Sequence, residues 1–195
     1  VGISAAAAVV EKVTGKPFHE FVQKRIFDKL GMADTHFFLP DAKRARLAQV
    51  YGGEPGSLKV FAHDRFRTGA QFANGAGGLY STASDMAKFI ESFVGKSLLS
   101  PAGTRLMTSL QTGDLLMDNG RERGVGIGWI ITRRTPVGTS LRPAGSFGHT
   151  GAFGTEYWAD PKSGTVAVFM AQTFGLPEDA RKSFDTMVAA ACCRD

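Results

Sequence analysis

The sequence contains only two cysteines, Cys192 and Cys193, and they are adjacent. Neighbouring cysteines do not readily reach the geometry of a disulfide bond, and no second pair is present to complete a zinc site. The cysteines therefore leave both their own role and the redox compartment of the protein undetermined.

Long hydrophobic runs are also absent. No apolar segment approaches the roughly 20 residues that a membrane-spanning helix needs, and no charged segment followed by an apolar core of signal-peptide type opens the chain. We therefore expect a soluble chain without a membrane span. The compartment, whether periplasmic, secreted or cytoplasmic, stays open.

The sequence has no concentrated basic stripe. Its 23 Lys and Arg residues against 18 Asp and Glu residues give a net charge of +5, but the basic residues fall in short groups at 43–46, 121–123 and 133–134. A nucleic-acid interface requires a continuous basic surface with interleaved aromatic side chains. We therefore expect no nucleic-acid partner.

The chain does contain enough apolar sequence for a core. Hydrophobic residues make up 43% of its 195 residues, and we expect a single domain over 1–195. Helical spacing of apolar residues predicts helices over about 5–13, 18–30, 83–94, 101–110 and 177–191. The apolar face of the second helix includes Ile26, and that of the last helix includes Met187. Runs rich in β-branched residues predict strands over about 125–132 and 146–149 and on both sides of a turn at 160–164. Short connections between the strands predict antiparallel pairing, so the expected fold class is α+β, an antiparallel sheet flanked by helices.

Local signals define where these elements begin and end. Ser4 is predicted to cap the first helix and Gly15 to end it, and Pro17 and Gly31 are predicted to begin and end the second. Ser100 and Pro101 are predicted to begin the helix over 101–110. Thr82 and Asp85 form a variant of the capping box before the central helix. Few periodic positions fall between about 35 and 78, which predicts long loops and leaves room for a short strand.

Several catalytic and binding motifs are missing. There is no G-x-S-x-G nucleophile elbow and no P-loop, and the four histidines share no H-x-x-x-H spacing. The glycine-rich run at 124–128 leads into strand-like sequence, so we attribute its glycines to close backbone packing and not to phosphate binding. We place His19, His36 and His63 in loops or on the surface, which leaves His149, in SFGHTGA, as the candidate functional histidine.

Four blocks of sequence nevertheless resemble, in order and spacing, the serine β-lactamase and penicillin-recognising family, especially its class C-like branch of β-lactamases, D-amino-acid peptidases and esterases. The blocks are VVEKVTGKPFHEFVQKRIFDKLGMADTHF, GAGGLYSTASDMAKFI, GVGIGW and GHTGAFGTEYWADPKSGTVAVFMAQT, and they span nearly the whole chain. The resemblance implies a β-lactamase/transpeptidase-like fold. It also implies a serine hydrolase that acts on small ester, amide or β-lactam substrates through an acyl-enzyme, with no metal or organic cofactor.

The site of that family combines three motifs, and this sequence has one of them. The run 149–151, His-Thr-Gly, resembles the K-T-G or H-T-G motif at the sheet edge. No serine is followed three residues later by lysine, and no tyrosine is followed two residues later by asparagine. The resemblance therefore implies the C-terminal portion of a larger hydrolase whose N-terminal part is missing, and we expect the chain to be inactive alone.

Four residues receive candidate roles on this basis. His149 would act as the catalytic imidazole near the leaving group, and the backbone N–H of Ala152 would be one oxyanion donor. Thr150 and Gly151 would bind substrate, the first through its hydroxyl and the second by letting an extended substrate approach the strand edge.

The residue types around the motif also bear on the substrate. Histidine in place of lysine anchors a carboxylate less firmly, which favours ester, amide or D-amino-acid substrates over β-lactams. We expect Tyr80, Tyr157 and Trp158 to pack in the core or at an edge and not to line a cleft.

Two other interpretations stay open. The chain can be a non-catalytic binding module, or a subunit completed by a separate N-terminal piece. It can also be a fragment whose exposed helical faces drive self-association. An in-frame S-x-x-K and tyrosine motif upstream would favour the truncated enzyme, whereas a start codon just before Val1 would favour the module.

Overall fold

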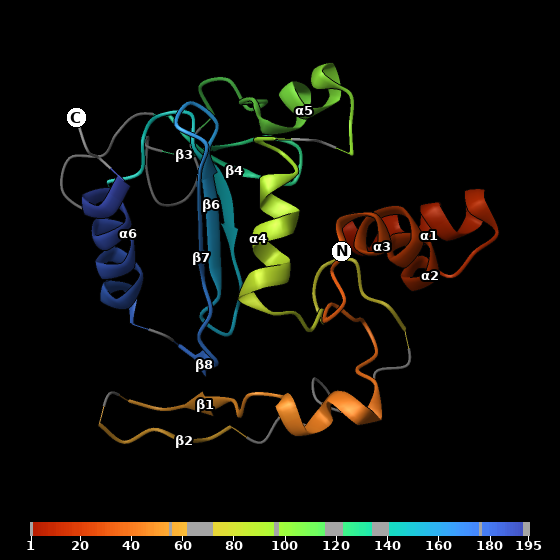
Figure 1. Cartoon of the computed structure of the whole chain (residues 1–195), viewed down its shortest axis with the longest axis horizontal. Coiled ribbons are helices and arrows are strands. Elements are labelled where there is room, and N and C mark those ends of the chain that lie inside the picture. Colours follow the sequence, from red (N-terminus) through yellow and green to blue (C-terminus); the bar gives the residue numbers. More distant parts are fainter. Residues whose placement is uncertain are drawn as a thin grey trace. The chain divides into compact units, whose positions relative to one another are not determined.

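The computed structural model describes residues 2–54, 56–61, 72–95, 98–115, 123–133, 141–175 and 177–192. The chain divides into two compact units, Val1–Lys88 and Phe89–Asp195, whose elements Figure 1 shows. His63 and Cys193 lie outside the described residues, so the placement of His63 in a surface loop stays a prediction. The single domain over 1–195 also stays a prediction.

Helix α1 (Gly2–Thr14) opens the first unit and ends where the sequence predicts. Gly15 adopts a φ of 65°, which favours glycine, and its N–H donates to the Glu11 carbonyl at 2.9 Å. The predicted cap is wrong, because Ser4 lies within the helix and its hydroxyl donates to Asn74 Oδ1 at 2.8 Å.

The second helical segment is continuous but contains a wider π-helical turn. It consists of α2 (Phe18–Val22), η1 (Gln23–Phe27) and α3 (Asp28–Leu30), and it ends at Gly31 with a φ of 66°, as predicted. Pro17 precedes the first turn instead of occupying it. The extra residue of the π turn brings Phe27, five residues after Val22, to the buried side, where the regular spacing had predicted Ile26.

Short elements interrupt the long segment that follows. A 3₁₀ helix, η2 (Asp41–Arg46), precedes an antiparallel pair of two-residue strands, β1 (Tyr51–Gly52) and β2 (Lys59–Val60). The backbones of His36 and Tyr80 exchange two hydrogen bonds of 2.9 Å. Over most of the described residues of this segment the prediction of loops is therefore correct, but the short strand is a pair of strands.

Helix α4 (Ala83–Glu91) begins with half of the predicted capping box. The Thr82 hydroxyl oxygen accepts a hydrogen bond from the Asp85 N–H at 3.2 Å. The Asp85 carboxylate instead accepts from the Asp34 N–H (2.7 Å) and the Thr35 hydroxyl (3.0 Å) and pairs with Lys88 (2.9 Å). Burial raises the pKa of Asp85, but these three donors outweigh burial and hold that pKa below its usual value.

An ion-pair cluster lies beside this cap. The Asp34 carboxylate contacts Arg46 at 2.8 and 2.9 Å and Lys43 at 2.8 Å, and the hydrogen bonds from Arg46 and then Lys43 hold the pKa of Asp34 well below its usual range. The ring of His36 lies 3.1 Å from Lys43 through Nε2. Burial, followed by the charge of Lys43, lowers the pKa of His36, so the neutral imidazole accepts from the ammonium group.

The second unit is built on a five-stranded antiparallel sheet. The strand order is β3 (Arg123–Val125), β4 (Ile130–Thr132), β5 (Phe147–Thr150), β6 (Glu156–Asp160) and β7 (Thr165–Phe169), and β8 (Thr173–Phe174) follows. Helix α6 (Glu178–Cys192) covers one face, and the last turn of α4 packs on the other (Figure 1). Ser100 caps α5 (Pro101–Thr108), as predicted, by accepting from the Gly103 N–H at 3.1 Å.

The predicted strand over 125–132 is two strands. Gly128, with a φ of 79°, turns the chain between β3 and β4. A Cβ at Gly124 would overlap Leu110, and one at Gly126 would lie 2.5 Å from the Met107 carbonyl oxygen. Close packing therefore explains these two glycines, whereas Gly128 is explained by its backbone conformation.

Five buried side chains form the core of the second unit: Ile90, Trp129, Ile131, Phe147 and Ala159. The Trp129 ring meets those of Phe93 (4.9 Å) and Phe147 (5.1 Å) edge to face. Such aromatic pairs contribute about 0.5–1.5 kcal/mol beyond the area that they bury.

The substitution Gly148→Ala should strongly destabilise the protein. A Cβ at Gly148 would overlap the Tyr157 carbonyl oxygen and lie 2.7 Å from Trp158 Cβ, so the paired strands would have to separate. We expect a loss of about 3 kcal/mol or more in the free energy of unfolding, measured by urea denaturation. Gly77→Ala, where no atom lies within 4 Å, is the control and should change it by less than about 0.5 kcal/mol. Equal effects would contradict the close approach.

The free energy of unfolding should fall in two steps as the pH is lowered. Because the folded pKa of His36 lies below the unfolded value of about 6.5, the unfolded chain binds the proton more readily, and stability decreases from about pH 6.5 down to the folded pKa. Because the pKa of Asp34 is also lowered, a second decrease should begin near pH 4, where the carboxylate of the unfolded chain starts to bind protons.

Urea titrations followed by circular dichroism at several pH values measure both steps. His36→Gln should remove the first step and retain the second. Asp34→Asn should retain the first step and reduce the second, which persists in part because the pKa of Asp85 is also lowered. A wild-type stability that does not change with pH below neutrality would refute this account.

Candidate active site

The end of β5 that carries the H-T-G sequence pairs with a strand on one side only. Strand β6 pairs with all four residues of β5, but β4 reaches only Phe147 and Gly148. Within the described part of the chain, no strand lies beside His149 and Thr150 on the β4 side. An added extended segment could therefore pair on that side, where it would compete with His149 Nδ1 for the backbone groups of Thr150.

His149 is exposed at this strand end, directly opposite Tyr157. Its Nδ1 lies 2.9 Å from the Thr150 N–H and 2.8 Å from the Thr150 carbonyl oxygen. The N–H can only donate and the carbonyl oxygen can only accept, so the first contact needs an unprotonated Nδ1 and the second needs an Nδ1 that carries the ring hydrogen. Either tautomer of the ring therefore finds a partner in the Thr150 backbone.

The strand continues into a tight turn over residues 151–155. The Gly151 N–H donates to the Thr155 carbonyl at 2.8 Å, and the Gly154 N–H donates to the Gly151 carbonyl at 3.2 Å. A Cβ at Gly151 would overlap the Thr155 hydroxyl oxygen. The turn itself therefore favours glycine at this position, independently of any substrate.

Ala152 is exposed at the tip of this turn. Its N–H makes no hydrogen bond with any residue that the structure describes. A backbone N–H that is fixed in a turn and not engaged by the protein is the kind of donor that an oxyanion requires.

A buried charged cluster lies behind the turn, on the α6 side of the sheet. Arg142 donates to Asp185 Oδ2 at 2.9 Å and to Glu156, and these side chains are 12%, 4% and 3% exposed. The Trp158 indole N–H donates to Asp185 Oδ1 at 2.9 Å, and the Arg142 guanidinium lies over the Trp158 ring. Breaking a buried pair of this kind costs about 3–5 kcal/mol.

The sequence did not indicate this cluster. The apolar spacing of the last helix predicted Met187 on its buried side, but Met187 is 67% exposed and Asp185 is 3% exposed. The charge of Asp185 is tolerated in the interior because Arg142 and Trp158 satisfy it. The sequence did not indicate a role for Arg181 either. This residue lies one turn earlier on α6, and its Nη2 donates to the Gly151 carbonyl at 3.3 Å.

Tyr157 and Trp158, near the strand end, pack against other side chains, as expected. Trp158 is 3% exposed, and the Tyr157 ring packs against Trp129 with centroids 6.1 Å apart. Burial raises the pKa of the Tyr157 phenol, which therefore stays protonated and is unsuited to act as a base.

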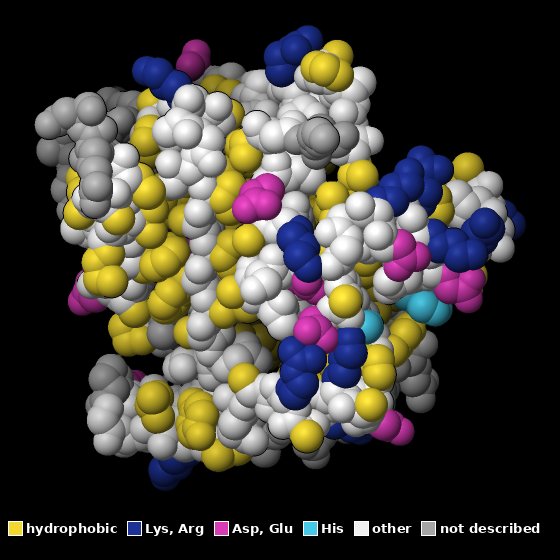
Figure 2. Space-filling view, viewed as in Figure 1, with side chains coloured by type: hydrophobic (Ala, Val, Ile, Leu, Met, Phe, Trp, Pro, Cys, Tyr) yellow, Lys and Arg dark blue, Asp and Glu magenta, His cyan; other side chains and the backbone are white. Residues whose placement is uncertain are grey.

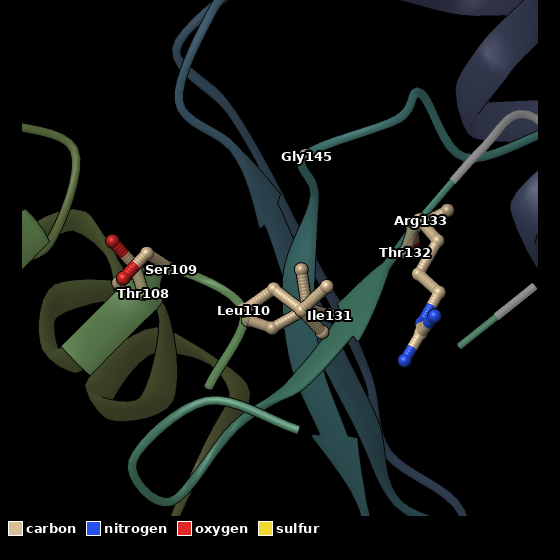
Figure 3. Close-up of a pocket in the computed structure, with 7 residues that line it drawn as sticks. All are labelled: Thr108, Ser109, Leu110, Ile131, Thr132, Arg133 and Gly145. Carbon is tan, nitrogen blue, oxygen red and sulfur yellow. The ribbon is translucent and has the colours of Figure 1, made fainter. Parts of the chain in front are cut away.

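A separate hollow of about 410 Å³ lies beside β4, away from the H-T-G end (Figure 3). Figure 3 shows Leu110 and Ile131 facing each other at its centre. Its only charged lining residue is Arg133, whose guanidinium donates to the Gly113 and Leu115 carbonyls. This hollow therefore offers no group for acid–base chemistry.

No group of three or more His, Cys, Asp or Glu side chains in the described segments is arranged to hold a metal ion. Likewise, none of the helices among the described residues is both long and apolar enough to cross a membrane.

An antiparallel sheet with helices on both faces and an H-T-G sequence at an open strand end defines an α+β protein of the β-lactamase/transpeptidase-like fold. The chain belongs to the beta-lactamase family, whose model matches residues 1–191. The solved structure of EstCE1, a hydrolase with promiscuous acyltransferase activity, superposes with a TM-score of 0.84 at 20% identity, over 97% of this chain and 54% of that one. The predicted family and fold class are thus confirmed.

Sequence comparison also finds relatives of this chain. Protein Rv1367c of Mycobacterium tuberculosis is 26% identical over 198 residues, which cover 87% of this chain and 47% of that protein. Lovastatin esterase of Penicillium rubens is 34% identical over 119 residues, which cover 57% of this chain and 30% of the esterase. The chain therefore spans half or less of the length of these relatives.

Proposed function

We propose that this chain forms one wall of the active site of a larger serine hydrolase, which cleaves its substrate through an acyl-enzyme. Membership of the beta-lactamase family supports the reaction class. The sequence holds no serine followed three residues later by lysine, and it spans about half the length of the relative from Mycobacterium tuberculosis. The nucleophile would therefore come from polypeptide outside this sequence.

The observation that carries the proposal is the geometry of the β5 end. The N–H of Ala152 makes no hydrogen bond with any described residue. No described strand pairs with Thr150 on the β4 side of β5. A substrate lying along this side as an added strand would place its carbonyl oxygen against the Ala152 N–H. The ring of His149, which is exposed at the same strand end, would transfer a proton to the leaving group or hold the attacking hydroxyl in place.

Esters are the substrate class that we favour. Histidine at the position of the usual lysine gives a weaker anchor for the carboxylate of a β-lactam or peptide. The similarity to a protein named lovastatin esterase supports the same choice.

Two exposed apolar surfaces support association with further polypeptide. On α1, Ala5, Ala6, Val9 and Val13 share one exposed face, and Val13 is 79% exposed. At the other end of the chain, β7 is the last strand of its sheet, and Figure 2 shows hydrophobic side chains gathered over β7 and α6. We assign the α1 face to contact with the part of the hydrolase that lies outside this sequence.

The chain alone should show no turnover of short-chain nitrophenyl esters or of a chromogenic cephalosporin. Extended by the polypeptide that its own reading frame encodes upstream, it should hydrolyse the esters faster than the cephalosporin. In the extended protein, His149→Ala should lower kcat by about 100- to 10,000-fold, because proton transfer is lost. His19→Ala is the control and should not change kcat, since that ring packs on Phe38 in the first unit.

If the chain alone hydrolyses a substrate and His149→Ala abolishes that activity, the prediction of an incomplete site is wrong. An upstream region without any serine nucleophile would favour the non-catalytic module.

Without its covering polypeptide, the α1 face should cause self-association. We expect the chain to elute and sediment as species heavier than its 20.8 kDa. Val13→Lys should shift it toward the monomer, because a charge on that face resists burial. Leu106→Lys, at a position 55% exposed on α5, is the matched control and should change nothing. A wild-type chain that is cleanly monomeric would refute the assignment.

A further inference from the structure

The carbonyl of Gly151 and the N–H of Ala152 belong to the same peptide group. The carbonyl oxygen accepts two hydrogen bonds, one from the Gly154 N–H at 3.2 Å and one from Arg181 Nη2 at 3.3 Å. One donor comes from within the turn and the other from α6, a different element of the fold. Both donors bind the carbonyl of this peptide group, on the side opposite the Ala152 N–H that is the proposed oxyanion donor.

Peptide planarity transmits this contact to the other side of the group. In a trans peptide the C=O and N–H bonds point in opposite directions in one plane, so fixing the carbonyl also fixes the direction of the N–H. A cationic donor on the carbonyl also polarises the amide, because linked hydrogen bonds strengthen one another. The Arg181 contact thus orients the Ala152 N–H and makes it a stronger donor.

The buried cluster holds Arg181 in register with the turn. Asp185 lies one turn further along the same helix and is fixed by the Trp158 indole and by Arg142, each at 2.9 Å. Glu156, which Arg142 also contacts, is the strand partner of Thr150. The cluster therefore ties α6 to β6 at the level of the H-T-G end and limits sliding of the helix past the turn.

We propose that Arg181 is a positioning residue that orients the Ala152 N–H as the oxyanion donor, by binding the carbonyl of the same peptide group. This inference rests on the proposed function, because it concerns the same donor. Arg181 acts through the peptide and touches no reacting atom.

The first experiment uses the chain alone, since it examines the turn and not turnover. Backbone resonances of Gly151 and Ala152 are compared by NMR in wild type, Arg181→Met and Arg181→Lys, with Lys182→Met on the same helix as the control. Arg181→Met should shift the Gly151 carbonyl and Ala152 amide resonances and speed hydrogen exchange at Gly154 about tenfold. Arg181→Lys should restore part of both effects, and Lys182→Met should produce neither.

The second experiment measures ester hydrolysis by the extended protein. Loss of a whole oxyanion donor lowers kcat by about 100- to 1,000-fold, so a misdirected donor should lower it by about tenfold. We expect Arg181→Met to lower kcat by that factor without a change in KM, and Arg181→Lys to recover part of it. A change in KM alone would contradict a role in orienting the oxyanion donor.

The two experiments separate this inference from the proposed function. Unchanged resonances at Gly151 and Ala152 in Arg181→Met would overturn the inference, whatever the turnover. Shifted resonances in an extended protein that hydrolyses no substrate would support the contact and overturn the proposed function.

Discussion

The second unit depends on the pairing of β5 with β6. Gly148 lies opposite Trp158, and the strands approach so closely there that no side chain fits between them. Because side chains alternate along a strand, the same ladder directs Phe147 into the aromatic core on one face and Trp158 toward α6 on the other. The next residues along β5 form the open H-T-G end. Core, closing helix and candidate site thus share a single register, and a slip by one residue would exchange the two faces.

Charge is used differently in the two units. In the first, the contacts of Asp34 with Lys43 and Arg46 are at least partly exposed to solvent, where each ion pair contributes roughly 0–1 kcal/mol. In the second, Arg142 is enclosed between Glu156 and Asp185, and a carboxylate left there without its cation would be costly. Such a cluster adds little net stability over an apolar core. It does define one arrangement of helix and strand, since other registers would bury an unpaired charge.

On the proposed function, this chain supplies the fixed hydrogen-bond donors of the site, and polypeptide outside this sequence supplies the nucleophile. The strand end and the 151–155 turn supply directional backbone groups, which need to be fixed before the substrate arrives. His149 is exposed on the same strand, and its Nδ1 contacts the N–H and the carbonyl oxygen of Thr150. The attacking hydroxyl would enter from polypeptide outside this sequence. The donors of this chain can be fully in place and still catalyse nothing, because they stabilise negative charge only when a nucleophile attacks the substrate and creates that charge.

The sequence by itself determined what depends on local backbone chemistry: the helix stops at Gly15 and Gly31, the caps before α4 and α5, the turn between β6 and β7, and the strand that carries H-T-G. The resemblance to a known family supplied the fold class and the candidate roles. Only the tertiary structure decided that one predicted strand is two, that Asp185 and not Met187 faces inward, and that Arg181 reaches Gly151. These features join residues tens of positions apart, and local propensity contains no information on which distant partner will satisfy a buried charge or a carbonyl.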